Sequence, residues 1–198
     1  MPSDPPRAGL RERKKARTRA AIQTHALRLF REQGYEATTV QQIIDEAEVS
    51  ESTFFRYFPT KADLVFTDEL DPLILDAVRR QPSGMPPVAA LRAAFHETFA
   101  SLAPEQELEF RVRSELAMAV PELRAAMLDQ FMTPMRLIAE AVGQRTGRPP
   151  DDPALGAFAG AVVGAVMGAT MAAIQGPPGS FAGAIDEAMA LLERGLVL

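Results

Sequence analysis

The sequence predicts an all-α protein of about nine helices. Apolar residues recur every three or four positions along most of the 198 residues, which is the spacing of a helix with one face in a core. No stretch of the sequence shows the strict alternation of a half-buried strand. Prolines and glycines gather between the periodic stretches, in residues 81–87, 147–153 and 176–179, and therefore mark loops.

The first expected helix follows a short tail. Residues 1–9 hold three prolines and one glycine, so we expect this tail to be disordered. A helix should then run from about Arg11 to Gln33, because its apolar residues share one face and Gly34 is suited to end it. The apolar face consists of Ile22, Ala26, Leu29 and Phe30.

Two short helices are expected next, between residues 39 and 58. Thr39 and Gln42 have the spacing of a capping box at the start of the first. Ser50 is placed to cap the second, which should end before Pro59 because the residue before a proline avoids helical geometry. Two short helices at this spacing form a helix-turn-helix, whose second helix can enter the major groove of DNA.

Six further helices should complete the fold, because their apolar residues keep the helical period. Their expected bounds are about 61–80, 88–102, 105–120, 121–146, 154–175 and 180–197. We therefore expect three parts in the chain. They are a disordered tail (1–9), a helix-turn-helix DNA-binding domain (10–60) and a second helical domain (61–198).

The segment from residue 38 to residue 64 resembles the DNA-binding domain of the TetR family of transcriptional regulators. The resemblance is carried by turn, cap and core positions along the whole segment. These are Thr39-Val40, Ile43-Ile44, Ala47, Val49-Ser50, Thr53, Phe54-Phe55, Tyr57-Phe58 and Thr60-Lys61. Two residues depart from the commonest pattern, since Glu48 stands where the turn usually has Gly and Phe55 where Tyr is usual.

The resemblance implies a homodimeric transcriptional regulator, expected to be a repressor, that binds a palindromic operator in double-stranded DNA. It also implies that residues 61–198 form an effector-binding and dimerisation domain. We expect Arg56, Tyr57 and Lys61 to meet phosphates. Base edges should face Ser52, Thr53 and Phe55, with Phe55 against a thymine methyl group. The full expected DNA-binding set is Arg17, Thr18, Thr39, Ser50, Glu51, Ser52, Thr53, Phe55, Arg56, Tyr57 and Lys61.

Charge is unevenly distributed along the chain. The net charge is −5, but residues 1–61 hold 11 Lys/Arg against 8 Asp/Glu, whereas residues 62–198 hold 10 against 18. Residues 7–31 alone hold nine basic residues and one acidic residue. A solvated helix with a charged tail would also give such a run. Its position directly before a helix-turn-helix favours a phosphate-binding surface instead.

Residues 153–175 contain no charged residue, and this length could span a bilayer. The segment is mostly Ala and Gly, however, and it lacks a Trp or Tyr belt and a nearby Lys/Arg cluster. We therefore expect no membrane contact. The resemblance implies that this helix and the last one pair with their copies in a four-helix bundle. The expected interface residues are Gly156, Gly160, Gly164, Gly168, Ile185, Met189 and Leu192.

Phenylalanines and methionines lie at helical spacings in the second domain. Such residues are more often simply core, but together they also suit an adaptable apolar pocket. The family binds small effectors in this region, so we expect a small hydrophobic effector. The candidate ligand-binding residues are Phe95, Phe99, Phe110, Met118, Met127, Phe131, Met135, Met167 and Met171.

Residues 111–131, together with the FFRYF run, resemble mycofactocin-type regulators whose C-terminal domain takes acyl-CoA-like ligands. Arg111 and Arg113 are therefore candidates for an anionic head group. The alternative, which the sequence favours, is that they are surface residues paired with Glu109 and Glu115.

Signals for an enzyme are weak. The chain has two histidines, His25 and His96, and His96 and Glu97 would point apart because neighbours on a helix do not face each other. No His/Asp/Glu cluster has metal-ligand spacing and there is no cysteine, so no metal or cofactor is expected. The absence of cysteine and of an apolar leader suits the cytoplasm. The rival interpretation is an all-α membrane-associated or ligand-binding protein that has lost DNA binding, for which Glu51 and Phe55 are the sequence support.

Overall fold

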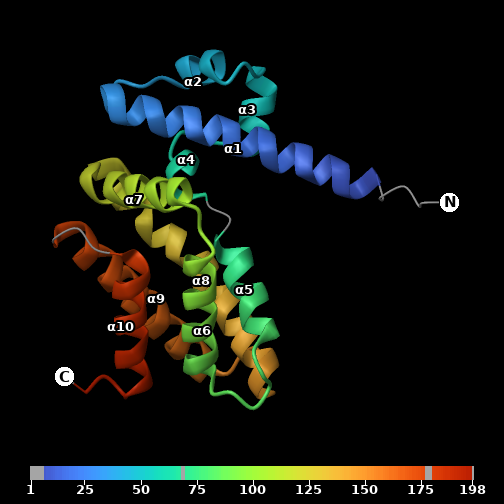
Figure 1. Cartoon of the computed structure of the whole chain (residues 1–198), viewed down its shortest axis with the longest axis vertical. Coiled ribbons are helices and arrows are strands. Elements are labelled where there is room, and N and C mark those ends of the chain that lie inside the picture. The colour runs from blue at the N-terminus through green and yellow to red at the C-terminus, as the bar shows by residue number, and fades with distance from the viewer. Residues whose placement is uncertain (1–6, 68–69, 177–179, 198) are drawn as a thin grey trace. The chain divides into compact units, whose positions relative to one another are not determined.

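The computed structural model describes residues 7–67, 70–176 and 180–197, and within them the side chains from residue 13 onward except that of residue 128. Ten helices and no strand occur in these ranges, which confirms the all-α prediction (Figure 1). The chain divides into two compact units, with the boundary after Thr67. Each unit has its own core.

The first unit contains α1 (Arg7–Gln33), α2 (Val40–Glu46), α3 (Glu51–Tyr57) and α4 (Asp63–Phe66). Its core is a set of apolar side chains that are at most 2% exposed. They are Ile22, Ala26, Phe30, Ile43, Phe54, Phe58 and Leu64. Each of the first three helices contributes to this set, so the short α2 and α3 are held by tertiary packing rather than by their own propensity.

Local signals set the ends of α2 and α3, as the sequence predicts. The Thr39 hydroxyl accepts a hydrogen bond from the Gln42 backbone, and the Gln42 side chain accepts one from the Thr39 backbone, so the capping box is present. The turn between the helices passes through Glu48, whose φ of 51° is left-handed. This conformation explains why glycine is the usual residue at that position, since it has no Cβ to clash.

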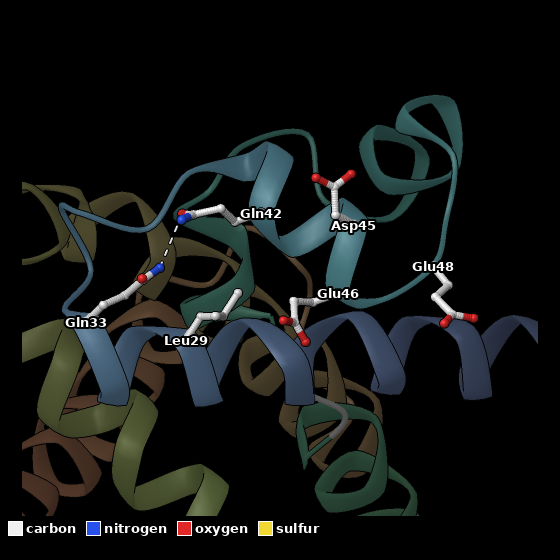
Figure 2. Close-up of a pocket in the computed structure, with 6 residues that line it drawn as sticks. All are labelled: Leu29, Gln33, Gln42, Asp45, Glu46 and Glu48. Atoms are coloured by element: carbon white, nitrogen blue, oxygen red, sulfur yellow. Dashed lines mark hydrogen bonds between the residues drawn. The ribbon is translucent and has the colours of Figure 1, made fainter.

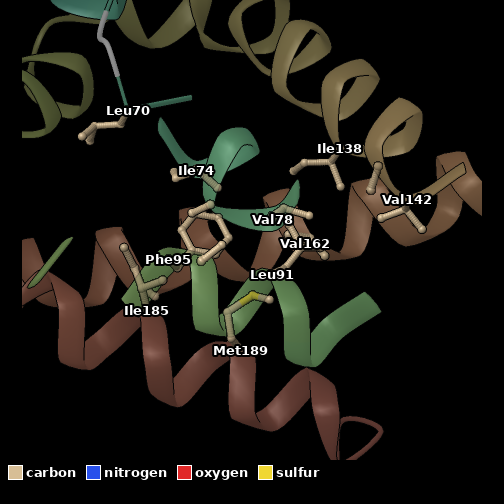
Figure 3. Close-up of a cluster of buried hydrophobic side chains, with 14 of the residues drawn as sticks. Leu70, Ile74, Val78, Leu91, Phe95, Ile138, Val142, Val162, Ile185 and Met189 are labelled. Atoms are coloured by element: carbon tan, nitrogen blue, oxygen red, sulfur yellow. The ribbon is translucent and has the colours of Figure 1, made fainter. Parts of the chain in front are cut away.

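The second unit contains α5 (Leu70–Arg80), α6 (Pro87–Ala100), α7 (Pro104–Ala119), α8 (Pro121–Thr146), α9 (Pro153–Gln175) and α10 (Phe181–Glu193). Four of these helices, α6 to α9, begin with proline in the first turn, where its missing N–H costs nothing. Figure 3 shows the core that α5, α6, α8, α9 and α10 share. Its labelled members include Ile74, Leu91, Val142, Val162 and Met189.

Charged residues join helices across the second unit. The Arg92 guanidinium of α6 donates to both carboxylate oxygens of Asp186 in α10, at 2.7 and 2.8 Å, and to Glu193 at 3.0 Å. The hydrogen bonds from Arg92 hold the pKa of the Asp186 carboxyl below its ordinary value. Arg145 at the end of α8 donates to the backbone carbonyls of Gln81, Pro82 and Met85, and so fixes the α5–α6 loop.

Three expected boundaries differ from the structure. Part of the expected tail is helical, because α1 begins at Arg7, while residues 1–6 lie outside the described residues. The expected helix 61–80 is two helices, α4 and α5. The side-chain amide of Gln23 in α1 donates to the carbonyls of Leu64 and Thr67, at 2.8 and 2.6 Å, and this contact attaches α4 to the first unit. The unit boundary therefore falls after Thr67 rather than after residue 60.

Candidate nucleic-acid interface and effector domain

Helix α3 has a buried apolar side and an exposed polar side. Phe54 and Phe58 are fully buried, and their ring centroids are 6.1 Å apart. The opposite side carries exposed side chains, which are Glu51, Ser52, Phe55 and Arg56. Two aromatic anchors therefore fix which residues of this short helix face away from the core.

Phe55 is the large apolar residue on this exposed side, with 43% of its surface accessible. Its ring meets the buried Phe54 ring edge to face, with centroids 5.3 Å apart, so the exposed ring is held in place. Arg56 lies over the Tyr57 ring, with 5.0 Å from the guanidinium carbon to the ring centroid. A fixed ring beside a guanidinium can meet thymine methyl groups, guanine edges or phosphates.

Two hydroxyl residues in the expected DNA-binding set also cap helices. Ser50 Oγ accepts from the Thr53 backbone N–H at 3.2 Å and lies 2.8 Å from Thr53 Oγ1. Thr39 Oγ1 has the same role at the start of α2. Both residues are exposed. As N-caps, their hydroxyl groups lie at helix N-termini, where backbone N–H groups and the helix dipole favour an anion.

Lys61 has a structural contact that the sequence did not reveal. Its ammonium donates to the carbonyls of Tyr35 and Thr38, at 2.8 and 3.0 Å, and lies 4.1 Å from the centroid of the Tyr35 ring. The side chain therefore holds the α1–α2 turn. An ammonium has three donor hydrogens, so two carbonyl contacts leave one for a phosphate.

Arg17 and Thr18 lie on α1, away from the helix-turn-helix motif itself. Arg17 is exposed, whereas the Thr18 hydroxyl donates to the Lys14 carbonyl of its own helix at 3.0 Å. Of the expected DNA-binding residues, the structure brings four onto one exposed surface, which belongs to α3. They are Glu51, Ser52, Phe55 and Arg56.

The hollow between α1 and α2 is acidic and does not suit DNA. It is lined by Leu29, Gln33, Gln42, Asp45, Glu46 and Glu48, and Gln33 donates to Gln42 at 3.2 Å (Figure 2). Arg28 donates to Glu46 at 2.5 Å and to Glu32 at 2.8 Å, which ties α1 to α2 beside this hollow. Three carboxylates around it would repel phosphate, so this hollow is not a candidate for the nucleic-acid surface.

In the second unit, aromatic rings from three helices meet edge to face. The Phe110 centroid lies 5.4 Å from that of Phe99 and 5.1 Å from that of Phe181. The Arg111 guanidinium lies over the Phe181 ring at 4.6 Å. Phe181 was missed from sequence because its place beside α7 depends on how α10 packs. Arg113 is 9% exposed, so the favoured expectation of two surface arginines is wrong for this residue.

The other expected ligand residues divide by burial. Phe95 is 7% exposed and belongs to the core, next to Leu91 in Figure 3. The remaining side chains are half-buried in one protomer. They are Met118, Met127, Phe131, Met135, Met167 and Met171. Half-buried Phe and Met side chains leave apolar surface that a ligand can cover, although the same placement also suits packing.

Helix α9 has an exposed side made of small residues. Its exposed positions include Ala157, Ala161, Gly164, Gly168 and Ala172. A Cβ added at Gly164 or Gly168 would meet nothing within 4 Å. The helix is long and apolar enough to cross a membrane by length and composition, a property that interface and core helices share.

Two of the expected interface residues are buried, and a third is half-buried. Ile185 and Met189 are 1% and 0% exposed, because they fill the core of the second unit. Gly160 is half-buried, with its side toward Met135, whose Cε would lie 3.4 Å from an added Cβ. On the exposed side of α9, the row of glycines at every fourth position is therefore interrupted at Gly160, and the exposed glycines lie on either side of it.

Comparisons with known proteins agree with this division into two units. Residues 22–67 match the family described as bacterial regulatory proteins, tetR family, and residues 85–197 match the MftR C-terminal domain. The regulator TcmR of Streptomyces glaucescens is 43% identical over 95 residues, which are 47% of this chain and 42% of that protein. YuxN of Bacillus subtilis strain 168, an HTH-type transcriptional regulator, is 40% identical over 53 residues, 27% of this chain and 18% of that protein. The matched stretches thus span less than half the length of either relative.

Solved structures resemble most of the chain. Thermus thermophilus FadR, a TetR-family transcriptional repressor in complex with lauroyl-CoA, superposes with a TM-score of 0.58 and 25% identity over 91% of this chain and 95% of that one. A TetR-family regulator from Syntrophomonas wolfei gives a TM-score of 0.64 at 17% identity, over 92% and 98% of the two chains. At that identity the second likeness shows the fold alone.

The two family matches account for both units described above. One covers the helix-turn-helix with its exposed α3 surface, and the other covers more than half of the chain, including the aromatic cluster. The second unit is therefore the ligand-binding domain of a regulator, and the chain is not an enzyme. The chain belongs to the TetR family of bacterial transcriptional regulators.

Proposed function

We propose that this regulator is a homodimeric repressor that binds a palindromic operator through α3 and is released by a small hydrophobic effector. The observation that carries the proposal is the exposed side of α3. There Glu51, Ser52, Phe55 and Arg56 stand clear of a core that holds the helix rigidly from behind. Because DNA is the ligand, we infer that the protein works in the cytoplasm.

Three of the four exposed residues of α3 have a chemical role in this proposal. The Phe55 ring meets a thymine methyl group, and Ser52 hydrogen-bonds a base edge. Arg56, Tyr57 and Lys61 contact phosphates and set the position of α3 on the duplex. The exposed hydroxyl groups of Thr39 and Ser50 support phosphates at helix N-termini. The side chains of Arg17 and Thr18 extend this contact along α1.

The exposed small residues of α9 support the homodimer. A face of Gly and Ala lets a second helix approach closely, and two-fold symmetry makes such a face its own complement. We propose that the interface includes Gly156, Gly164, Gly168 and the half-buried Leu192. A two-fold dimer would place two copies of α3 on successive half-sites of a palindrome.

The aromatic cluster supports an effector with an apolar chain and an anionic end. FadR, the neighbour at 25% identity, was solved with lauroyl-CoA. In this chain Phe99 and Phe110 offer apolar surface, and Arg111 lies on the adjoining Phe181 ring. We propose an acyl thioester of the acyl-CoA class, with its chain along the Phe and Met side chains and its anionic part toward Arg111 and Arg113.

Binding of the purified protein to the DNA that flanks its own coding region tests the DNA-binding part. Fluorescence anisotropy should show saturable binding to one duplex, and an unrelated duplex of equal length should bind 10³-fold or more weakly, which is about 4 kcal/mol. Equal affinity for both duplexes at physiological salt would remove the proposed operator function.

Titration with lauroyl-CoA, dodecanoate and coenzyme A tests the effector. Lauroyl-CoA should lower operator affinity by roughly 5- to 150-fold, and saturating operator must lower lauroyl-CoA affinity by the same factor. Met167→Ala should weaken this effect while leaving the free protein's operator affinity near normal. Equal lauroyl-CoA affinities with and without operator would show that a bound thioester does not regulate DNA binding.

A further inference from the structure

The N-terminal part of α1 extends far beyond the core of the first unit. The helix begins at Arg7, and among its side chains from residue 13 onward the first that is buried is Ile22. At 1.5 Å per residue, roughly 22 Å of helix precedes that residue. The match to the tetR family also begins at residue 22, so this extension lies outside it. In Figure 1 it continues past α2 and α3 toward the N-terminus.

The extension carries positive charge on every side. Its basic residues from 13 onward are Arg13, Lys14, Lys15, Arg17 and Arg19, and no acidic residue occurs between Arg13 and Arg31. Before them the extension holds two further basic residues, Arg7 and Arg11, and one acidic residue, Glu12. At 100° per residue, Arg13 and Arg17 share one side of the helix, whereas Lys15 and Arg19 share nearly the opposite side. Residues 13–17 are all exposed, and among the described residues none of these five side chains forms an ion pair.

This arrangement is unfavourable for an isolated helix. Like charges four residues apart, as in Arg13–Arg17 and Lys15–Arg19, repel each other by about 0.2–0.5 kcal/mol per pair. Cations near a helix N-terminus also oppose the helix dipole. A helix that is polar all round has no buried face to offset these effects. Contact with a polyanion would remove both penalties, because it replaces repulsion between cations with attraction to phosphates.

We propose that the extension from Arg7 to Arg19 is a second DNA-binding element, which contacts phosphates that flank each operator half-site. The inference rests on the proposed operator function and adds a footprint beyond the helix-turn-helix. Two or three cations face the duplex whichever side of the helix is turned to it. At 3.4 Å per base pair, the extension is long enough to follow about six base pairs. Its contribution is independent of sequence and sensitive to salt.

Charge removal tests the element in the full chain. The variant carries Arg13→Gln, Lys14→Gln and Lys15→Gln, and the control carries Arg79→Gln, Arg124→Gln and Arg194→Gln, which are exposed residues of the second unit. Each lost phosphate contact flattens the slope of log affinity against log salt by about 0.9. If half or more of the six charges lost per dimer contact phosphate, the slope becomes shallower by about 3 to 5 units. The control should keep the wild-type slope.

Duplex length gives a second measurement. Wild-type protein should bind an operator extended by ten base pairs on each side at least tenfold more tightly than one trimmed to the half-sites, whereas the triple variant should bind both alike. Ala16→Pro keeps every charge but interrupts the helix, and it should lose part of the gain from flanking DNA. Full retention of that gain in Ala16→Pro would overturn the helical form of the element.

The outcomes separate this inference from the proposed function. A wild-type protein that does not distinguish its operator from unrelated DNA would refute the proposed function. A wild-type protein that does distinguish them, with a triple variant whose slope and length dependence equal those of the control, would refute the extension alone. Thermal unfolding should give the same Tm for the wild type and the triple charge variant, because the extension buries no side chain between residues 13 and 21.

Discussion

The two exposed surfaces that this chain offers, one on α3 and one on α9, differ in chemistry and in permanence. The α3 surface is charged and polar around one aromatic ring, whereas the α9 surface is uncharged and consists of Gly and Ala. A polar surface is stable in water and can bind and release its partner. An apolar strip on a 23-residue helix favours a partner that stays bound. The difference would let one chain combine the proposed lasting self-contact with a reversible contact to DNA.

The largest expected effect comes from Gly164→Leu on the α9 surface. The new side chain meets nothing inside the protomer, so the protomer should fold, but its bulk should separate the paired helices. Sedimentation velocity should show monomers, and operator affinity should fall by 100-fold or more because each half-site alone binds weakly. Gly84→Leu, in an open loop, is the matched control. A Gly164→Leu protein that remains dimeric would place the interface elsewhere.

On the α3 surface, Phe55→Ala should reduce DNA sequence specificity more than it reduces folding stability. The ring is exposed, and its contact with Phe54 is one edge of a core that remains filled. Loss of the thymine contact should reduce discrimination at one base pair of each half-site by about 1 to 3 kcal/mol. Binding to operators with each base at that position would measure it. Unchanged discrimination at every position would exclude Phe55 from base reading.

Lys61→Ala should affect both the fold of the first unit and DNA binding. The ammonium donates to two carbonyls of the α1–α2 turn, and charged hydrogen bonds of this kind contribute about 1.5 to 3 kcal/mol when well buried, so we expect about 1 to 2 for this half-buried side chain. All DNA sequences should bind more weakly, with a salt slope flatter by about one unit per lost phosphate contact. A normal Tm with altered base preference would contradict both roles.

Glu48→Gly should stabilise the first unit. An L-residue in the left-handed region destabilises the folded protein by roughly 1 to 2 kcal/mol, and glycine removes this strain. Glycine also has more conformational freedom in the unfolded chain, which offsets about half of the gain in stability. We expect a gain near 1 kcal/mol and an unchanged DNA sequence preference, measured by thermal unfolding and anisotropy. Glu36→Gly, at an exposed position whose φ is not in the left-handed region, should not stabilise. A loss of stability in Glu48→Gly would mean that the Glu48 side chain makes a contact that stabilises the fold by more than the left-handed backbone destabilises it.

The smallest expected effect is the acid response of the Arg92–Asp186 pair. The pKa of Asp186 is lower in the folded protein than its ordinary value, because Arg92 donates two hydrogen bonds to the carboxylate. Its stabilisation is therefore present above about pH 4 and is lost as the pH falls through the folded pKa. Both side chains are about one-third exposed, so we expect less than about 1 kcal/mol. Asp186→Asn should flatten the loss of Tm between pH 5 and pH 3; an identical pH profile would assign this loss to other groups.

The sequence predicted the helix-turn-helix well because its determinants are local. The caps at Thr39 and Ser50 and the buried Phe54 and Phe58 act within a few residues, and the structure has each of them as expected. The split of the expected 61–80 helix could not be predicted in this way. It is associated with Gln23, more than forty residues earlier, whose amide binds the carbonyls at the end of α4.

In the second unit, the hydrophobic periodicity predicted the helices but not which side of each helix faces outward. Ile185 and Met189 have the spacing of an interface, yet they fill the protomer core because α10 turns that side toward α6 and α9. Lys61 likewise has the position of a phosphate contact, and its carbonyl partners lie in a turn some twenty-five residues earlier. Residues whose roles depend on distant partners are those that sequence reasoning placed only in part.

The shortness of α3 has a genetic consequence. Seven residues are too few to form a stable helix in water, so the α3 surface exists only while Phe54 and Phe58 remain packed in the core of the first unit. A screen for mutants that fail to silence a reporter should therefore recover buried positions of the first unit as often as exposed ones. The two groups would be told apart by heat, since interior mutants regain silencing in colonies grown at lower temperature and surface mutants do not.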